Sequence, residues 1–314
     1  MAVRLLIKVR VSNVSVVAKD ILSLEFSPVD REKLPAYLPG SNVILRLKKG
    51  LSRQYSLCGN PDSNIYKIAV KRETQGRGGS EYLHNQVRKD DILYLSYPQP
   101  DFNIDINFDS YVFIAGGIGI TPLLSFLYFL SDKNKKVSLH YCVRDIESAA
   151  FLDELRHFPI ELKVYCSAQG RRANFEDILS NYKQNTALYY CGSARLSEAV
   201  CRATHHWPAG AIFSEYFSAP VMTGEDLGDV FTAEIPRSGH ILTVPENKTL
   251  LQVLLDDGVD LDFSCEAGTC RSCIIDIVSG EIIHKDKCLT EDERKTLMTP
   301  CVSRGKGVIV INSL

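Results

Sequence analysis

Three cysteines, Cys265, Cys270 and Cys273, lie close together in the stretch CEAGTCRSC. The spacing C-x4-C-x2-C, with a further cysteine downstream, is typical of the loop that holds a plant-type [2Fe-2S] cluster. We expect Cys301 to be the fourth ligand, because it leads into an apolar terminal strand, whereas Cys288 lies among charged residues. A structural zinc site is the alternative, although zinc motifs usually repeat C-x2-C pairs.

A second set of residues, in RQYSL at 53–57, suits a phosphorylated aromatic ligand. Arg53 can fork onto a phosphate, Tyr55 can cover a ring and Ser56 can reach a ring nitrogen. The stretch GRGGS at 76–80 exposes main-chain amides before SEYLHNQV, which we expect to be helical. Amides at such a helix start can bind an anion. A plain strand end and a flexible surface loop are the respective alternatives.

Two further turns, GGIGITP at 116–122 and CGS at 191–193, each follow an apolar strand and open a helical segment. Gly116, Gly117 and Gly119 permit close approach of a ligand at the carboxyl end of a strand, where α/β sheets bind nucleotides. The first turn departs from the G-x-G-x-x-G fingerprint of dinucleotide-binding folds. A tight structural turn is the alternative for each, but two such turns in one parallel sheet favour a nucleotide site.

Three kinds of scaffold are expected to position these residues. Residues 1–104 alternate short β-branched runs with Gly and Pro, which predicts an antiparallel β-barrel. Residues 105–220 alternate apolar strands with helical stretches such as AAFLDELRHF, which predicts an α/β domain with a parallel sheet. Small and polar residues at 221–228 indicate a linker, and residues 229–314 read as two strands and a helix before the cysteine loop.

Composition excludes several classes of partner. A formal net charge of -2 gives no basic excess for nucleic acid, and no apolar run is long enough to span a membrane. The chain has ten cysteines but no secretory signal, so we expect a reducing, cytoplasmic location.

In this order, RQYSL, GRGGS, GGIGITP, CGS and CEAGTCRSC resemble the phthalate dioxygenase reductase family over essentially the whole chain. These proteins are the reductase components of Rieske oxygenases, and the family includes the vanillate demethylase and carnitine monooxygenase reductases. The resemblance implies an FMN-binding barrel, a nicotinamide-binding domain and a β-grasp ferredoxin domain, in that order. It further implies an NAD(P)H-dependent, monomeric oxidoreductase that passes electrons from NADH through FMN and a [2Fe-2S] cluster to a Rieske-type oxygenase. A stand-alone flavin or ferric reductase, and an electron carrier without nucleotide use, are the alternatives.

The resemblance also implies roles for individual residues. Ser56, near the reactive edge of the flavin, and Phe217, which would cover the flavin where nicotinamide enters, are the expected catalytic residues. Core packing is the alternative for Phe217. The residues expected to bind cofactors are Arg53, Gln54, Tyr55, Ser56, Arg77, Gly78, Gly79 and Ser80 for FMN, and Gly116, Gly117, Ile118, Gly119, Thr121, Pro122, Arg144, Ser167, Arg171, Arg172, Cys191 and Gly192 for the dinucleotide, with Phe217 between the two.

The chain departs from the family pattern at three places. Ser193 follows Cys191-Gly192 where the family commonly has Pro, and Arg271 replaces a glycine between two cluster cysteines, where it could raise the cluster potential or help to dock an acidic partner. Arg171 and Arg172 stand in a segment that is acidic in phthalate dioxygenase reductase. Since a carboxylate there favours NADH and arginines accommodate the 2′-phosphate of NADPH, the choice of nucleotide stays open.

Overall fold

The computed structural model describes residues 6–48, 51–74, 76, 78–217, 228–259, 261, 263, 266–268, 271 and 273–312. The chain divides into two compact units, one of residues 4–47 and 55–217 and the other of residues 1–3, 48–54 and 218–314. No helix in the described ranges is long and apolar enough to cross a membrane.

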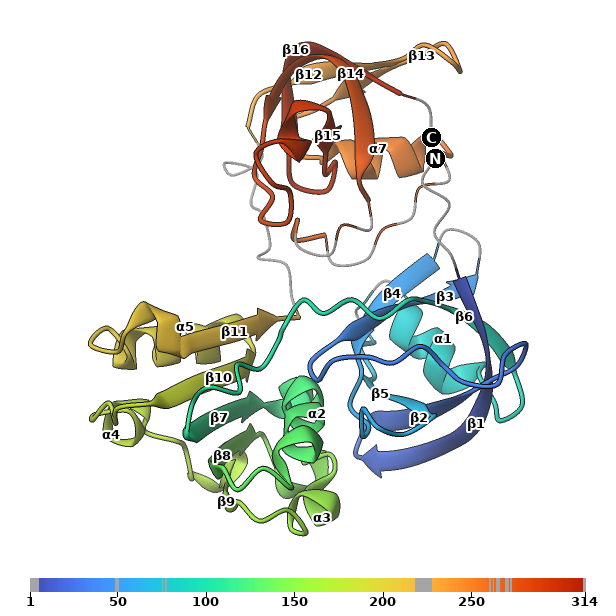
Figure 1. Ribbon diagram of the computed structural model, residues 1–314. Coiled ribbons are helices and arrows are strands. Elements are labelled where there is room, and N and C mark those ends of the chain that lie inside the picture. Colours follow the sequence, from blue (N-terminus) through green and yellow to red (C-terminus); the bar gives the residue numbers. More distant parts are fainter. Residues whose placement is uncertain are drawn as a thin grey trace. The chain divides into compact units, whose positions relative to one another are not determined.

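The first sheet is an antiparallel barrel of six strands in the order β4-β3-β6-β1-β2-β5 (Figure 1). Alternate residues of its first strand, Ile7, Val9 and Val11, are fully buried, as expected for a strand with one face on the core. Its elements are β1 (Leu6–Ala18), β2 (Ile21–Pro28), β3 (Asn42–Lys48), β4 (Leu51–Ser56), β5 (Tyr66–Lys71), α1 (Gly79–Asn85) and β6 (Ile92–Ser96).

The second sheet has five parallel strands in the order β11-β10-β7-β8-β9. The chain runs outward from β7 to β9 and then returns to β10, on the other side of β7. Open α/β sheets bind ligands at such a switch point, outside the carboxyl ends of the strands. The elements are β7 (Ser110–Gly116), α2 (Ile120–Leu130), β8 (Lys136–Val143), α3 (Leu152–Leu155), β9 (Glu161–Cys166), α4 (Phe175–Ile178), β10 (Thr186–Gly192), α5 (Ala194–Ala203) and β11 (Ile212–Tyr216).

Helix α2 is buried on nearly all sides, because both the barrel and the parallel sheet pack against it. Its residues share one buried cluster with Cys58 and Ala69 of the barrel and with Tyr189 of the parallel sheet. Phe126 on α2 lies 5.3 Å, centroid to centroid, from Phe102. A helix that is hydrophobic all round requires burial of this kind. The barrel and the parallel sheet therefore have a common core.

The third sheet, in the order β13-β12-β16-β14-β15, is mixed, and one helix covers it in a β-grasp arrangement (Figure 1). Phe231, Ala233 and Ile235 alternate inward on β12 and meet Leu250 and Leu254 of the helix. The helix begins at a capping box formed by Thr249 and Gln252. The elements are β12 (Phe231–Ile235), β13 (His240–Val244), α7 (Leu250–Asp256), β14 (Ile275–Ile283), β15 (Leu297–Met298) and β16 (Arg304–Ile311).

A buried arginine ties the loops of this third sheet together. The Arg304 side chain is 2% exposed, and its guanidinium donates to the main-chain oxygens of Asp229 at 2.7 Å, Lys248 at 2.8 Å and Pro245 at 3.1 Å. The guanidinium carbon of Arg304 also lies over the ring of Phe231, 4.9 Å from the ring centroid. Every hydrogen bond here ends on a carbonyl, so the arginine supplies donors that the loops lack.

The structure confirms the three expected architectures, and it corrects one helix. AAFLDELRHF was predicted to be helical throughout, but only α3, a single turn, forms. Phe151 precedes it with a φ of 60°, and the left-handed region interrupts a helix. The predicted linker lies almost entirely outside the described residues.

Candidate functional site

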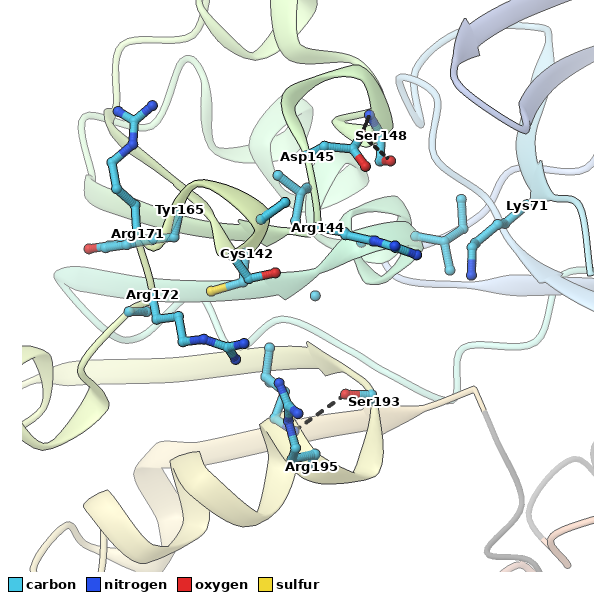
Figure 2. A pocket seen from close by; sticks show the side chains of 18 of the residues that line it. Lys71, Cys142, Arg144, Asp145, Ser148, Tyr165, Arg171, Arg172, Ser193 and Arg195 are labelled. Atoms are coloured by element: carbon cyan, nitrogen blue, oxygen red, sulfur yellow. Dashed lines mark hydrogen bonds between the residues drawn. The ribbon is translucent and has the colours of Figure 1, made fainter.

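A cavity of about 940 Å³ opens at the carboxyl ends of the parallel strands (Figure 2). Its walls come from the turn after β7, the ends of β8 and β9, the segment that follows β9, helix α5, and residues 19–21 and 71–72 of the barrel. The residues predicted to bind the dinucleotide that line this cavity are Gly116, Gly117, Ile118, Arg144, Ser167, Arg171 and Arg172. The size is within the range of small-molecule and cofactor sites.

The two glycine-rich turns meet at one edge of this cavity. A Cβ on Gly119 would lie 2.2 Å from the carbonyl oxygen of Cys191, and a Cβ on Gly116 would lie 3.1 Å from the Cα of Gly192. These glycines are thus required for the packing of one turn on the other. Gly117 is different, because its φ is 54° and an added Cβ would meet nothing within 4 Å.

The remaining predicted dinucleotide residues support the turns without lining the cavity. Thr121 and Pro122 are buried in the first turn of α2, and the Thr121 hydroxyl donates to the carbonyl of Ile118 at 3.0 Å. Cys191 is fully buried, and burial raises the pKa of its thiol well above the usual range. The next residue, Ser193, was not among the predicted binding residues but does line the cavity; it caps α5, where its hydroxyl accepts from the amide of Leu196 at 3.4 Å.

Ser56 of the barrel reaches an acidic side chain of the parallel sheet. Its hydroxyl donates to Oε2 of Glu215 at 3.4 Å, and Glu215 on β11 pairs in register with Cys191 on β10. Burial raises the pKa of Glu215 from 4.5 to about 8, against the lowering effect of the Ser56 hydrogen bond. Glu215 therefore holds a proton at neutral pH.

Phe217 follows β11 directly, and its side chain is 40% exposed. The alternative of core packing is wrong for this residue, since a core aromatic would be covered. Its ring stands at the carboxyl end of the edge strand of the parallel sheet, two residues after Glu215.

The residues predicted to bind FMN lie on β4 and at the start of α1. On β4, Arg53, Gln54 and Tyr55 are half-buried and Ser56 is buried. Gly78 precedes α1 with a φ of 78°, Gly79 begins the helix, and the Ser80 hydroxyl accepts from the amide of Glu73 at 3.0 Å. Arg77 lies outside the described residues.

In the third sheet, Cys273 and Cys301 are each 3% exposed, whereas Cys288 is half-buried. Cys265 and Cys270 lie outside the described residues. Gly268, in the same loop, has a φ of 67°, and a Cβ there would lie 2.6 Å from Cγ2 of Val302 and 2.9 Å from the Cα of Asp286. The loop is thus seated against the segment that carries Cys301.

Arg271 is bound within this loop. Its guanidinium donates to the carboxylate of Glu293 and to the carbonyl of Cys288. The hydrogen bond from Arg271 is the main cause that lowers the pKa of Glu293 to about 2. The charge of Arg271 is therefore compensated, which weakens the expectation that it docks an acidic partner.

Comparison with known proteins identifies the family of the chain and locates one of its parts. Residues 234–305 match the 2Fe-2S iron-sulfur cluster binding domain. Phthalate dioxygenase reductase from Burkholderia cepacia is 33% identical over 314 residues, covering 98% of this chain and 97% of that protein. The chain belongs to the phthalate dioxygenase reductase family. It is also 34% identical to the heme-dependent oxidative N-demethylase beta subunit of Ectopseudomonas mendocina, over 92% of this chain and 96% of that one.

A solved structure of phthalate dioxygenase reductase, which transfers electrons from pyridine nucleotides to [2Fe-2S], matches this family member with a TM-score of 0.76. The two share 33% sequence identity over 98% of each chain. The fold and the order of its parts are thus those of the phthalate dioxygenase reductase family.

Sequence reasoning about this reductase missed three side chains at the sites. Glu215 carries a signal in retrospect, since it is a lone carboxylate in the otherwise uncharged strand IFSEY, two residues before Phe217. Arg195 and Arg202 line the cavity from α5. They stand seven residues apart, which places them on one face of a helix, and that spacing is visible in ARLSEAVCRA.

Proposed function

We propose that the protein takes hydride from a reduced pyridine nucleotide and delivers electrons singly to a partner oxygenase. The observation that carries this proposal is the cavity at the switch point of the parallel sheet, with the protonated Glu215 and the Ser56 hydroxyl of the barrel beside its glycine-rich turns. When bound, FMN accepts a hydride and gives up single electrons, which a [2Fe-2S] cluster can carry one at a time.

The residues of the chain would bind and orient these groups. We assign the FMN phosphate to Arg53, Arg77 and the amides of 78–80, and the flavin ring to Tyr55. Gly117 and Arg144 would hold the nicotinamide half of the dinucleotide, and Phe217 would cover the flavin until nicotinamide replaces it. The Ser56 hydroxyl could donate a proton at the flavin edge and accept a replacement proton from the Glu215 carboxyl, because Ser56 and Glu215 are hydrogen bonded to each other.

The four cluster ligands would be Cys265, Cys270, Cys273 and Cys301. The near-complete burial of Cys273 and Cys301 fits this set, because burial shields thiolate-bound iron from water. The half-buried position of Cys288 supports leaving it out. We retain 1–104, 105–220 and 229–314 as the flavin, nucleotide and cluster parts, joined by a linker at 221–228.

We infer that the partner is a Rieske-type oxygenase. We further infer that the reductase is a monomer and that both proteins are located in the cytoplasm. A heme enzyme is the second candidate, because the relative from Ectopseudomonas mendocina is a subunit of a heme-dependent demethylase. Transfer to purified oxygenases of the two kinds, followed by substrate turnover, distinguishes them. The molar mass of the purified reductase, measured by light scattering, tests whether it is a monomer.

The proposal is tested by anaerobic visible spectra of the purified protein before and after addition of NADH or NADPH. We expect flavin bands and broad cluster absorbance, both bleached by at least one nucleotide. Absence of bleaching by either nucleotide would leave an electron carrier without nucleotide use. Release of the reduced flavin into solution would instead favour a stand-alone flavin reductase.

A pair of variants tests the cluster ligands in the same experiment. Cys301→Ser should lose cluster absorbance and cytochrome c reduction while its flavin is still bleached. Cys288→Ser, its matched control, should behave as the wild type. Loss of the cluster in Cys288→Ser alone would reverse the assignment.

A further inference from the structure

The cavity at the carboxyl ends of the parallel strands is strongly cationic. Eight lysine and arginine side chains line it, against two aspartates, Asp20 and Asp145. Asp145 is occupied locally, since it accepts from the amide of Ser148 at 3.0 Å and from its hydroxyl at 2.7 Å. In Figure 2 this pair lies on the opposite side of the cavity from Arg172. The described lining offers no carboxylate at the Arg172 end.

Three arginines at that end come from two elements. Arg172 follows β9, while Arg195 and Arg202 lie on one face of α5 with the small Ala199 between them. All three arginine side chains are exposed, and within the described part of the chain no carboxylate forms an ion pair with any of them. Figure 2 shows Arg172 directed toward α5, whereas Arg171 turns away and donates to the side chain of Gln169.

Such an arrangement favours a ligand with a concentrated negative charge. Guanidinium groups that line one cavity repel each other, and a phosphate monoester, with a charge of about −1.5 to −2, removes that repulsion. Arginine also matches phosphate geometry, because its fork donates two parallel hydrogen bonds.

The opposite end of the cavity contains a separate cation, Arg144. Arg144, at the end of β8, extends toward Lys71 in Figure 2 and lies on the side away from Arg172. Nicotinamide must approach the glycine-rich turns near Ser56, so the adenosine half extends toward the other end of the cavity. There its ribose meets arginines, where dinucleotide folds that select the unphosphorylated ribose use a carboxylate.

We propose that the cavity selects NADPH over NADH, with Arg172, Arg195 and Arg202 around the 2′-phosphate of the adenosine. This inference rests on the proposed reductase function and specifies its substrate. Arg172 is the leading specificity residue, since its side chain is directed across the cavity toward α5, the helix that carries the other two arginines (Figure 2).

The test is calorimetric titration of the full-length, oxidised protein with 2′,5′-ADP and with 5′-AMP, which differ by the 2′-phosphate alone. We expect 2′,5′-ADP to bind at least about tenfold more tightly, the effect of one charge-assisted contact. Arg172→Gln should reduce that ratio by about tenfold and leave the affinity for 5′-AMP unchanged. Arg156→Gln, an exposed arginine of the same part of the chain that does not line the cavity, is the matched control.

Equal affinities for the two fragments, or an unchanged ratio in Arg172→Gln, would overturn the inference. Flavin bleaching by NADH would then leave the proposed reductase function intact. Conversely, tight 2′,5′-ADP binding without bleaching by NADH or NADPH would support the phosphate site and overturn the reductase function. The ratio of kcat/KM for NADPH and NADH, measured in wild type and Arg172→Gln, should follow the fragment affinities.

Discussion

Glu215 should make the stability of the protein depend on pH in a way that one substitution removes. Its carboxyl has a pKa of about 8 in the folded chain, raised from 4.5 chiefly by burial. The folded state therefore binds a proton more tightly than the unfolded state, so stability is highest below pH 4.5 and is lost as pH rises through about 8. At about 1.4 kcal/mol per pH unit, the whole interval amounts to at most about 5 kcal/mol.

The groups around Glu215 show that the pH dependence can be assigned to Glu215 itself. Ser56 donates to Glu215, Cys191 lies beside it in register, and Asp101 contributes a smaller repulsion that also raises its pKa. Burial keeps the thiol of Cys191 protonated over this range, so it adds no charge. Glu215→Gln keeps the shape of the side chain and cannot ionise. The difference in unfolding free energy between wild type and Glu215→Gln should thus shift by roughly 3 kcal/mol between pH 5 and pH 7.5.

Urea unfolding at a series of pH values, followed by circular dichroism, measures this difference directly. Glu161→Gln, which removes an exposed carboxylate paired with Lys163, serves as the control and should track the wild type within about 0.5 kcal/mol. Parallel curves for wild type and Glu215→Gln across the whole range would refute the burial of an acidic proton at this position.

Two further substitutions test the packing that holds the sites. Gly119→Ala should destabilise the protein by about 3 kcal/mol, because its Cβ would overlap the carbonyl oxygen of Cys191, whereas Gly210→Ala has no neighbour within 4 Å and should melt as the wild type in calorimetry. Equal melting of the two would contradict the close contact of the turns. Arg304→Met should lower the free energy of unfolding by about 3 kcal/mol, because several loop carbonyls lose their hydrogen-bond donor. Lys306→Met, which removes an exposed cation, is the control and should change it little. Urea unfolding compares the two variants, and equal midpoints would contradict the role of Arg304 in connecting the loops.

The features that were predicted correctly are those written in local sequence. The two strands and the helix expected before the cysteine loop form as β12, β13 and α7. The glycine-rich turns were found because a close main-chain approach requires residues without a side chain. Cys301 was preferred over Cys288 from the polarity of its neighbours, and the burial of its side chain is consistent with that choice.

The features that were missed depend on contacts between distant segments. Glu215 and Ser56 are 159 positions apart, so nothing near either residue predicts the hydrogen bond between them or the raised pKa that burial produces. The helix expected in AAFLDELRHF has a suitable composition, but Ala150 and Phe151 are drawn into the core of the parallel sheet, which leaves one helical turn. Tertiary packing overrides local propensity at this point.

The common core around α2 bears on how such chains can be recombined. A gene fusion that exchanged the barrel alone would cut through the contacts of Phe102 with Phe126 and would expose apolar surface on both sides of the junction. Residues 228–312, in contrast, have a separate hydrophobic cluster and their own helix. A chimaera joined between residues 217 and 228 leaves each of these two hydrophobic clusters within one parent sequence. Protein engineering could therefore exchange residues 228–312 while the barrel and the parallel sheet stay together.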